Sequence, residues 1–348
     1  MVLNFSANAL GLGNAATPFG IRAMQALDTL NPHKGTATNA MVMFLVINTA
    51  SITILPTTVV ALRAAAGSSD AAAIVPTTLF ATIVATTVAI VCARLLQRFW
   101  PIPSASDTAI PSEARAAAER EFPEGAPASS EAMLRTLPIA ESAGYPIWVS
   151  WLVLAGIVGL IPLMILFGRG ISPWVIPGLM ASLLIFGFLR KVPVYEAFVE
   201  GAKDGFAVAI RIIPYLVAIL VAIGMLRASG ALEAIIDAIS PVTQAFGLPA
   251  EALPMAMMRS LSGSGAYGIM ASILNDPTIG PDSYVGLLVS TIQGSSETTF
   301  YVLAVYCGAV QIKRMRHAVA CGLIADVAAV LAAVLICTLL FADGIEML

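Results

Sequence analysis

Residues able to bind a solute or an ion interrupt an apolar run near the C-terminal end of the chain. The stretch 293–299, with the sequence QGSSETT, supplies a carboxylate, an amide and four hydroxyl groups, and apolar segments flank it. Groups of this kind occur at membrane depth where they are buried in protein or line a watery cavity. The stretch therefore predicts half of a substrate or ion site, to which we assign Gln293, Ser295, Ser296, Glu297 and Thr298.

Glu297 is the charged residue of this stretch. A charged side chain at the centre of a membrane costs at least about 2.5 kcal/mol on insertion scales, so a compensating partner is expected. Glu297 could bind a cation, carry a proton, or pair with Arg259 in a neighbouring apolar run. Arg259 could hold an anionic group of a substrate or only neutralise Glu297. Asp326, in the last apolar run, is a second candidate for coupling, with packing against a polar helix as the alternative.

Three other apolar runs are interrupted in the same way. Residues 1–28 are broken near Gly11–Asn14, which favours a re-entrant hairpin of two half-helices over an amphipathic surface helix. The run 41–62 contains polar residues at 48–53 followed by Pro56, which indicates either a broken span or a kinked helix. The run 250–274 is broken at 259–265. The candidate ligands at these breaks are Asn8, Asn14, Asn48, Thr49, Ser51, Thr53, Arg259, Ser262 and Ser264.

Aromatic residues near the second pair of breaks offer a further mode of binding. Tyr267, Tyr301 and Tyr306 could stack on a planar substrate, although tyrosines at such positions are more often packing residues.

Composition places the chain among the multi-pass helical membrane proteins. Apolar residues make up 58% of the chain and charged residues only 11%, compared with roughly a quarter charged residues in soluble proteins, and the mean hydropathy is +0.89. A net charge of −3 gives no reason to expect a nucleic-acid partner. The four cysteines show no CxxC spacing, P-loop, HExxH and GxGxxG motifs are absent, and no signal peptide is recognised. We therefore expect no metal, no cofactor and no enzymatic activity.

The apolar runs divide the chain into four parts. Residues 1–98 form a first repeat, 99–144 a linker rich in proline and acidic residues, 145–171 a connecting transmembrane helix, and 172–348 a second repeat. Plain spans are expected at 71–96, 172–189, 212–226 and 318–341, and amphipathic helices along the membrane interface at 192–211 and 232–246. The predicted fold is an all-α polytopic membrane protein.

The two repeats carry the same pattern in opposite orientations. Gly11–Gly13 aligns with Gly263–Gly265, and 48–53 aligns with 293–298, so each repeat has a re-entrant hairpin, a broken span and a plain span. The two separations differ by seven residues, which we assign to a loop. Most basic residues near span ends fall on one side of the threaded chain and only Arg63, Arg169 and Arg227 on the other, so the first side is cytoplasmic. Broken helices in inverted repeats are typical of an alternating-access site at the membrane midplane.

Several segments resemble a known family. The stretches 211–217 (RIIPYLV), 224–231 (GMLRASGA), 259–264 (RSLSGS) and 294–301 (GSSETTFY) closely resemble spore maturation protein B, and 8–18 (NALGLGNAATP) resembles spore maturation protein A. The chain is thus similar to a fusion of the two, in the nucleoside-recognition "gate" group, which is similar to concentrative nucleoside transporters. The resemblance implies hairpins and unwound helices around a central site. It also implies that the first repeat is N-terminally incomplete, because spore maturation protein A has further membrane helices ahead of this stretch.

These observations predict a transporter-like protein of the inner membrane that moves a small polar solute by alternating access. Coupling to H⁺ or Na⁺ and assembly into a homo-oligomer are left open. The linker is expected in the cytoplasm and the C-terminus outside. The alternative is a membrane scaffold or solute-binding receptor that uses the same cavity without transport.

Overall fold

The computed structural model describes residues 1–9, 11, 16–101 and 246–341, together with part of the segment 174–238. Every element named within these ranges is a helix, which agrees with the predicted all-α class. Asn14, most of the linker 99–144, the helix 145–171 and most of the helix 232–246 lie outside the described residues. Of the predicted amphipathic helix 192–211, residues 194–203 are helical.

The described helices form two series with the same order. The first series comprises α1 (Val2–Ala9), α2 (Thr17–Thr29), α3 (Asn39–Ala50), α4 (Thr57–Ala65) and α5 (Val75–Leu96). The second comprises a 3-10 turn, η3 (Ala250–Ala252), followed by α11 (Leu253–Leu261), α12 (Gly263–Leu274), α13 (Tyr284–Ser295), α14 (Thr299–Gly308) and α15 (Ala318–Phe341). Each series therefore contains two short helices, a helix interrupted in its middle and one long helix.

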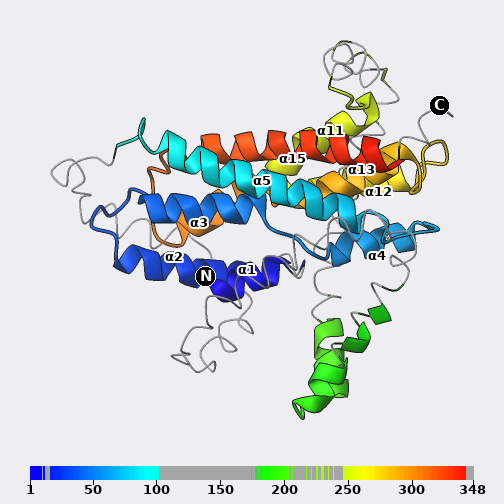
Figure 1. Cartoon of the computed structure of the whole chain (residues 1–348), viewed down its shortest axis with the longest axis horizontal. Helices are drawn as coiled ribbons and strands as arrows, with labels where there is room; N and C mark the ends of the chain where they lie inside the picture. Colours follow the sequence, from blue (N-terminus) through cyan, green and yellow to red (C-terminus); the bar gives the residue numbers. More distant parts are fainter. Residues whose placement is uncertain are drawn as a thin grey trace.

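The two long helices, α5 and α15, form the centre of the fold and run side by side along the long axis of the molecule (Figure 1). Within the described residues they are the two helices long and apolar enough to cross a membrane. Small residues line the faces that pack, because Ala81, Ala85 and Ala89 on α5 and Ala325 and Ala329 on α15 are almost fully buried. Small side chains let two membrane helices approach closely.

The start of α5 differs from the prediction. The predicted span began at residue 71, whereas residues 71–74 form a turn and the helix begins at Val75. Pro76 lies in the first turn of the helix, where its missing N–H and fixed φ are tolerated. The proline therefore marks the start of the span more accurately than hydropathy does.

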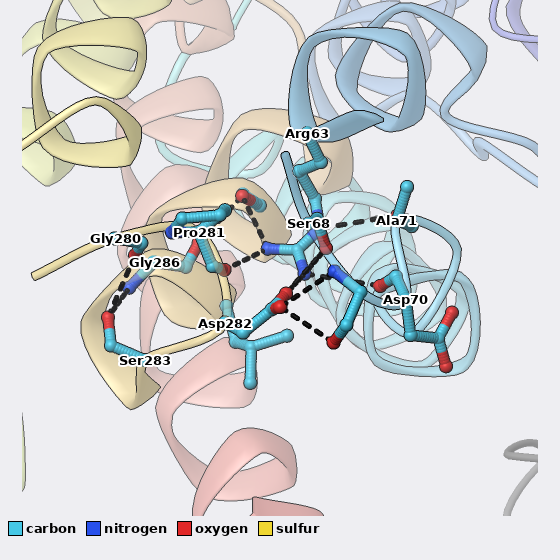
Figure 2. A network of polar contacts seen from close by, with 12 residues as sticks. Arg63, Ser68, Asp70, Ala71, Gly280, Pro281, Asp282, Ser283 and Gly286 are labelled. Carbon is cyan, nitrogen blue, oxygen red and sulfur yellow. Dashed lines mark hydrogen bonds and ion pairs between the residues drawn. The ribbon is translucent and has the colours of Figure 1, made fainter. Parts of the chain in front are cut away.

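A buried arginine joins the two series at one end of the molecule. Arg63, near the end of α4, is fully buried and bonds to Ser68 at 3.0 Å, to the Pro281 carbonyl at 2.6 Å and to Asp282 at 3.1 Å. Figure 2 shows its guanidinium between the loop that follows α4 and the loop that precedes α13. Ser69 also donates to Asp282, through its backbone N–H and its hydroxyl. We call Arg63, Ser68, Ser69, Pro281 and Asp282 the Arg63 network.

The carboxyl group of this network is held in its charged form. Partial burial acts to raise the pKa of Asp282, but the hydrogen bonds from Ser68 and Ser69 and the charge of Arg63 outweigh it, so the pKa is lowered. The network is therefore an ion pair reinforced by hydroxyl and amide donors.

A second loop contact joins the two series at the opposite end. Gly35 accepts hydrogen bonds from the backbone N–H groups of Lys313 and Arg314, each at 3.0 Å, and Ala37 donates to the Arg314 carbonyl. The Arg316 guanidinium donates to the carbonyl of Ala37 at 3.2 Å. We call these five residues the Gly35 contact. It joins the loop before α3 to the loop after α14.

We expect the protein to lose stability in acid because of His317, which lies beside the Gly35 contact. Burial and the nearby Arg316 charge lower its pKa from the ordinary value of 6.5, and a backbone partner at Ala93 opposes them only in part. The unfolded chain binds a proton at this histidine below about pH 6.5, whereas the folded chain resists it until a lower pH. The free energy of unfolding should therefore fall as the pH drops below about 6.5. Melting of the purified protein between pH 8 and pH 5, compared with His317→Gln, measures this, and an unchanged slope in the variant would contradict it.

Candidate functional site

The first interrupted helix breaks between Ala50 and Thr57, where α3 ends and α4 begins. Ser51 adopts a φ of 40° there, which non-glycine residues rarely adopt. Thr82 on α5 holds the open backbone, because its hydroxyl donates to the Ser51 carbonyl and accepts from the backbone N–H of Thr53 at 3.3 Å. Strained, externally held backbone of this kind clusters at functional sites. The helix is broken here rather than kinked.

The first hairpin lies directly on this break. The Ala9 carbonyl at the end of α1 accepts hydrogen bonds from the backbone N–H groups of Ile54 at 2.9 Å and Leu55 at 3.3 Å. Gly11, with a φ of 65°, sits so close that a Cβ atom would collide with the Leu55 carbonyl oxygen. The Thr57 hydroxyl donates to the Gly11 carbonyl. The hairpin therefore supplies acceptors to a segment that has lost its own helical hydrogen bonds.

The second hairpin lies on the second break in a similar manner. Ser262 separates α11 from α12 and caps α12 by accepting from the Gly265 N–H at 3.1 Å. A Cβ atom at Gly263 would lie 2.8 Å from the Thr298 hydroxyl. Arg259 donates to the same hydroxyl at 3.0 Å. A side chain at Gly263 would therefore displace the Thr298 hydroxyl, to which Arg259 donates.

The two breaks also meet each other. The backbone N–H of Glu297, in the second break, donates to the carbonyl of Thr49, at the end of α3, at 2.8 Å. Next to this contact lies a cavity of about 20 Å³, lined in part by Asn8, Asn48 and Glu297. Its other lining residues are Ala16, Thr17, Tyr301, Val302 and Tyr306. A space of this size holds about one water molecule.

The amide and phenol groups beside the cavity form two hydrogen-bonded pairs, Asn8 with Asn48 and Asn4 with Tyr306. Asn8 donates to the Asn48 side-chain oxygen at 3.0 Å, and Asn48 donates to the Phe44 carbonyl at 2.8 Å. Asn4 donates to the Tyr306 hydroxyl at 3.2 Å, and the Tyr306 ring stacks on Phe44 with centroids 6.0 Å apart. Asn8 and Asn48 therefore hold α1 against α3 beside the cavity.

Arg259 and Glu297 form a loose ion pair. The nearest guanidinium nitrogen and carboxylate oxygen are 3.9 Å apart, too far for a hydrogen bond. The Arg259 side chain is 6% exposed and that of Glu297 is 34% exposed. The Arg259 Nε has no hydrogen-bond partner among the described residues. Pairing with Arg259, one of the alternatives for Glu297, is thus present but leaves the carboxylate accessible from the cavity.

The other predicted site residues take different positions. Thr49 and Ser295 bond back to carbonyls of their own helices, and the hydroxyls of Ser51 and Thr53 lie 3.5 Å apart within the first break. Ser264 lies 3.4 Å from Ser262. Ser296 and Gln293 are buried, and neither polar side-chain atom of Gln293 has a hydrogen-bond partner among the described residues. These residues surround the breaks, but none of them lines the cavity.

Three polar contributors were not predicted: Asn4, Thr82 and Thr17, which lines the cavity. Asn4 lies in α1, and its amide holds Tyr306 and the Ala16 carbonyl beside the cavity. Thr82 is one of several threonines on α5, and neither spacing nor composition distinguishes it from the others. An asparagine within the apolar run 1–28 was the available signal for Asn4, and no sequence signal marks Thr82.

Comparison with known proteins identifies a family and several relatives. A family model described as "Gate: Nucleoside recognition" matches residues 209–313, which include the second hairpin and the second break. Spore maturation protein B of Bacillus subtilis is 49% identical over 169 residues, covering 49% of this chain and 94% of that protein. Spore maturation protein A of the same organism is 44% identical over 91 residues, covering 26% of this chain and 46% of that protein. Inner membrane protein YjiG of Escherichia coli K12 is 33% identical over 81 residues, which are 23% of this chain and 53% of that protein. No solved structure matches the chain significantly.

The match to spore maturation protein B extends over nearly that protein's whole length at high identity. Together with the apolar helices α5 and α15 and the inner-membrane relative, it identifies a membrane protein. The chain therefore belongs to the nucleoside-recognition Gate family, with regions similar to spore maturation proteins A and B joined in one sequence.

Proposed function

We propose that the chain is an inner-membrane transporter that moves a small polar solute by alternating access between two inverted repeats. The solute binds where the breaks in α3–α4 and α13–α14 meet, with Glu297, Asn8 and Asn48 as its first contacts. The single observation that carries this proposal is the hydrogen bond between Glu297 and Thr49, which brings two unwound helices together beside a polar cavity. Unwound helices at membrane depth are tolerated where they line a site.

The equal lengths of one pair of corresponding helices, and of the loops that precede them, support the proposal that the two series are repeats of one unit. α3 and α13 are both 12 residues long, and each begins with a hydroxyl side chain that caps a backbone N–H, Thr38 in α3 and Ser283 in α13. The loop from Thr29 to Asn39 has the same length as the loop from Leu274 to Tyr284. Equal helices joined by equal loops are expected of two copies of one unit.

The loop contacts support the inversion. The Gly35 contact joins the beginning of α3 to the end of α14, and the Arg63 network joins the end of α4 to the beginning of α13. The two interrupted helices therefore run antiparallel. Each contact pairs a loop that follows a hairpin in one series with a loop that follows the interrupted helix in the other.

The helix bounds change one detail of the predicted alignment. The seven-residue difference was assigned to a loop, and the helix bounds show that it is not the loop between hairpin and interrupted helix, because those loops are equal in length. Six of the seven residues lie in the connection between α1, which ends at Ala9, and α2, which begins at Thr17, whereas Ser262 alone separates α11 from α12. The seventh lies in α2, which has 13 residues against 12 in α12. Gly11 and Gly263 therefore correspond because each lies against a break. They do not occupy the same position along the two repeats.

The size of the cavity supports a transport cycle with more than one conformation. A space of about 20 Å³ cannot hold an organic solute, so a substrate requires the hairpins to move away from the breaks. The Arg63 network and the Gly35 contact close the two ends of the molecule in this conformation. We assign the conformation to an occluded state, in which the end with the Gly35 contact faces the cytoplasm because it carries Lys313, Arg314 and Arg316.

Flux measurements test the proposal. The purified full-length protein in proteoliposomes should take up at least one labelled solute from a panel of nucleosides and other small polar solutes; nucleosides come first because of the description of the matching family model. Uptake should exceed that of protein-free liposomes. Binding of a panel member without any flux, under pH and Na⁺ gradients of either direction, would instead assign the chain to the alternative, a receptor or scaffold.

Cysteine labelling tests the inversion separately. In a variant whose four native cysteines are replaced, Leu30→Cys and Asn275→Cys introduce exposed thiols at the ends of α2 and α12. A membrane-impermeant maleimide should label Leu30→Cys only from the cytoplasmic face and Asn275→Cys only from the outer face. Labelling of both positions from the same face would refute inverted repeats.

A further inference from the structure

The two long helices hold the two breaks with different chemistry. On α5, one hydroxyl is enough: Thr82 donates to carbonyls at Ala50 and Ser51 and accepts from the Thr53 N–H. No charge is involved, and the first break has Ile52 where the second has Glu297. A neutral hydrogen-bonding side chain is therefore sufficient to support an unwound segment of this protein.

On α15, the side chain that bonds to the interrupted helix beside its break is a carboxyl group. Asp326 Oδ2 accepts a hydrogen bond at 2.8 Å from the hydroxyl of Thr299, the first residue of α14. Asp326 is only 7% exposed, and its Oδ1 has no hydrogen-bond partner among the described residues. A buried, ionised carboxylate with an oxygen that lacks a hydrogen-bond donor is costly. Holding α14 would need only a serine, a threonine or an asparagine at this position.

Charged groups near Asp326 connect it to the cavity. Arg259 and Ser260, both on α11, face the carboxyl group, and Arg259 also lies 3.9 Å from Glu297, which lines the cavity. Among the described residues, the other helices packed against α15 bring Cys92 and the terminal Arg94 on α5, Tyr284 on α13, and Tyr301, Tyr306 and Cys307 on α14. The remaining helix, α3, carries no titratable side chain. One arginine is thus placed between two carboxyl groups.

We propose that Asp326 is the coupling site of the transporter and that its ligand is a proton, an inference that rests on the proposed transport function. When Asp326 carries the proton, it is neutral, so Arg259 pairs with Glu297 alone. When the proton leaves, the carboxylate competes for Arg259, and Glu297 is released toward the cavity. The loose contact at 3.9 Å fits a pair that must break and re-form during each cycle.

Infrared spectroscopy of the full-length protein tests the proton directly and requires no substrate. The wild-type protein should show the carbonyl-stretch band of a protonated carboxylic acid, which shifts in D₂O and disappears as the pH is raised. Asp326→Asn keeps an acceptor for Thr299 but cannot bind a proton at the carboxyl group, so it should lose the band. Glu297→Gln should keep the band but move its disappearance to lower pH, because Arg259 is then free to stabilise the ionised Asp326 carboxylate. Asp282→Asn, which removes an ionised aspartate outside the site, should also keep the band.

The variants separate the possible outcomes. A band lost in Glu297→Gln and kept in Asp326→Asn would overturn the assignment, as would the absence of a titrating, deuterium-sensitive band in the wild-type protein. The wild-type measurement keeps the test decisive if Asp326→Asn fails to fold. The band is independent of flux, so its absence would leave the transporter proposal intact. In proteoliposomes with a labelled solute that the wild type accumulates along a pH gradient, Asp326→Asn should lose that accumulation, and accumulation unchanged from the wild type would contradict the proposal.

Discussion

Replacing Arg63 with methionine should lower the free energy of unfolding by about 3 kcal/mol, because the substitution removes a fully buried guanidinium and leaves several part-buried acceptors without their donor. The guanidinium donates to the carbonyls of Ala71 at 3.2 Å, Asp70 at 3.2 Å and Pro281 at 2.6 Å, in addition to Ser68, Ser290 and Asp282. Methionine fills much of the same volume, so packing is largely kept while all six hydrogen bonds are lost. Thermal unfolding in detergent measures the effect, with a thiol-reactive dye that reports the exposure of the four buried cysteines.

Lys34→Met is the matched control for this substitution. Lys34 also pairs with an aspartate, Asp28, but its side chain is 58% exposed. An exposed ion pair contributes at most about 1 kcal/mol, so this variant should melt close to the wild type. Equal melting temperatures for Arg63→Met and Lys34→Met would show that the Arg63 network does not hold the two series together.

The interruptions of the helices could be predicted from the sequence because membrane burial leaves few alternatives. Polar residues at 48–53 and 293–299 cannot remain in a continuous apolar helix without partners, and the helix breaks within each segment, after Ala50 in the first and between Ser295 and Thr299 in the second. The order of short, interrupted and long helices follows from the same reasoning. Asn8, Asn48 and Glu297 were also predicted, and the structure brings all three to one cavity.

The partners of these residues could not be predicted, because they are set by how distant helices pack. Arg63 is a single basic residue near a span end, and its sequence neighbours do not indicate burial beneath a loop more than 200 positions away. Thr82 differs from the other threonines of α5 only in facing the first break. Asp326 could be recognised as unusual in an apolar helix, but its hydrogen bond to Thr299 depends on the crossing of α14 and α15.

Replacing Glu297 with glutamine should reduce solute uptake about 10- to 100-fold, because a hydrogen bond to a charged group contributes about 1.5–3 kcal/mol. Glu297 lines the cavity and keeps a third of its side chain exposed, so its carboxylate is available to a ligand. Glutamine has nearly the same shape, and the backbone hydrogen bond to Thr49 does not depend on the side chain. Initial rates of uptake in proteoliposomes measure the effect. Glu251→Gln, at an exposed position in η3, should retain wild-type uptake.

The double variant Glu297→Gln/Arg259→Gln separates two roles for the carboxylate. If Glu297 only neutralises Arg259, the single substitution leaves a buried cation without its partner, and removing both charges should restore uptake. If Glu297 binds the solute, uptake should stay low in the double variant. We expect the second result, because the 3.9 Å pair has no hydrogen bond and Arg259 already donates to Thr298 at 3.0 Å. Recovery of uptake would place Glu297 among the structural ion pairs and would move the binding role to the amides of Asn8 and Asn48.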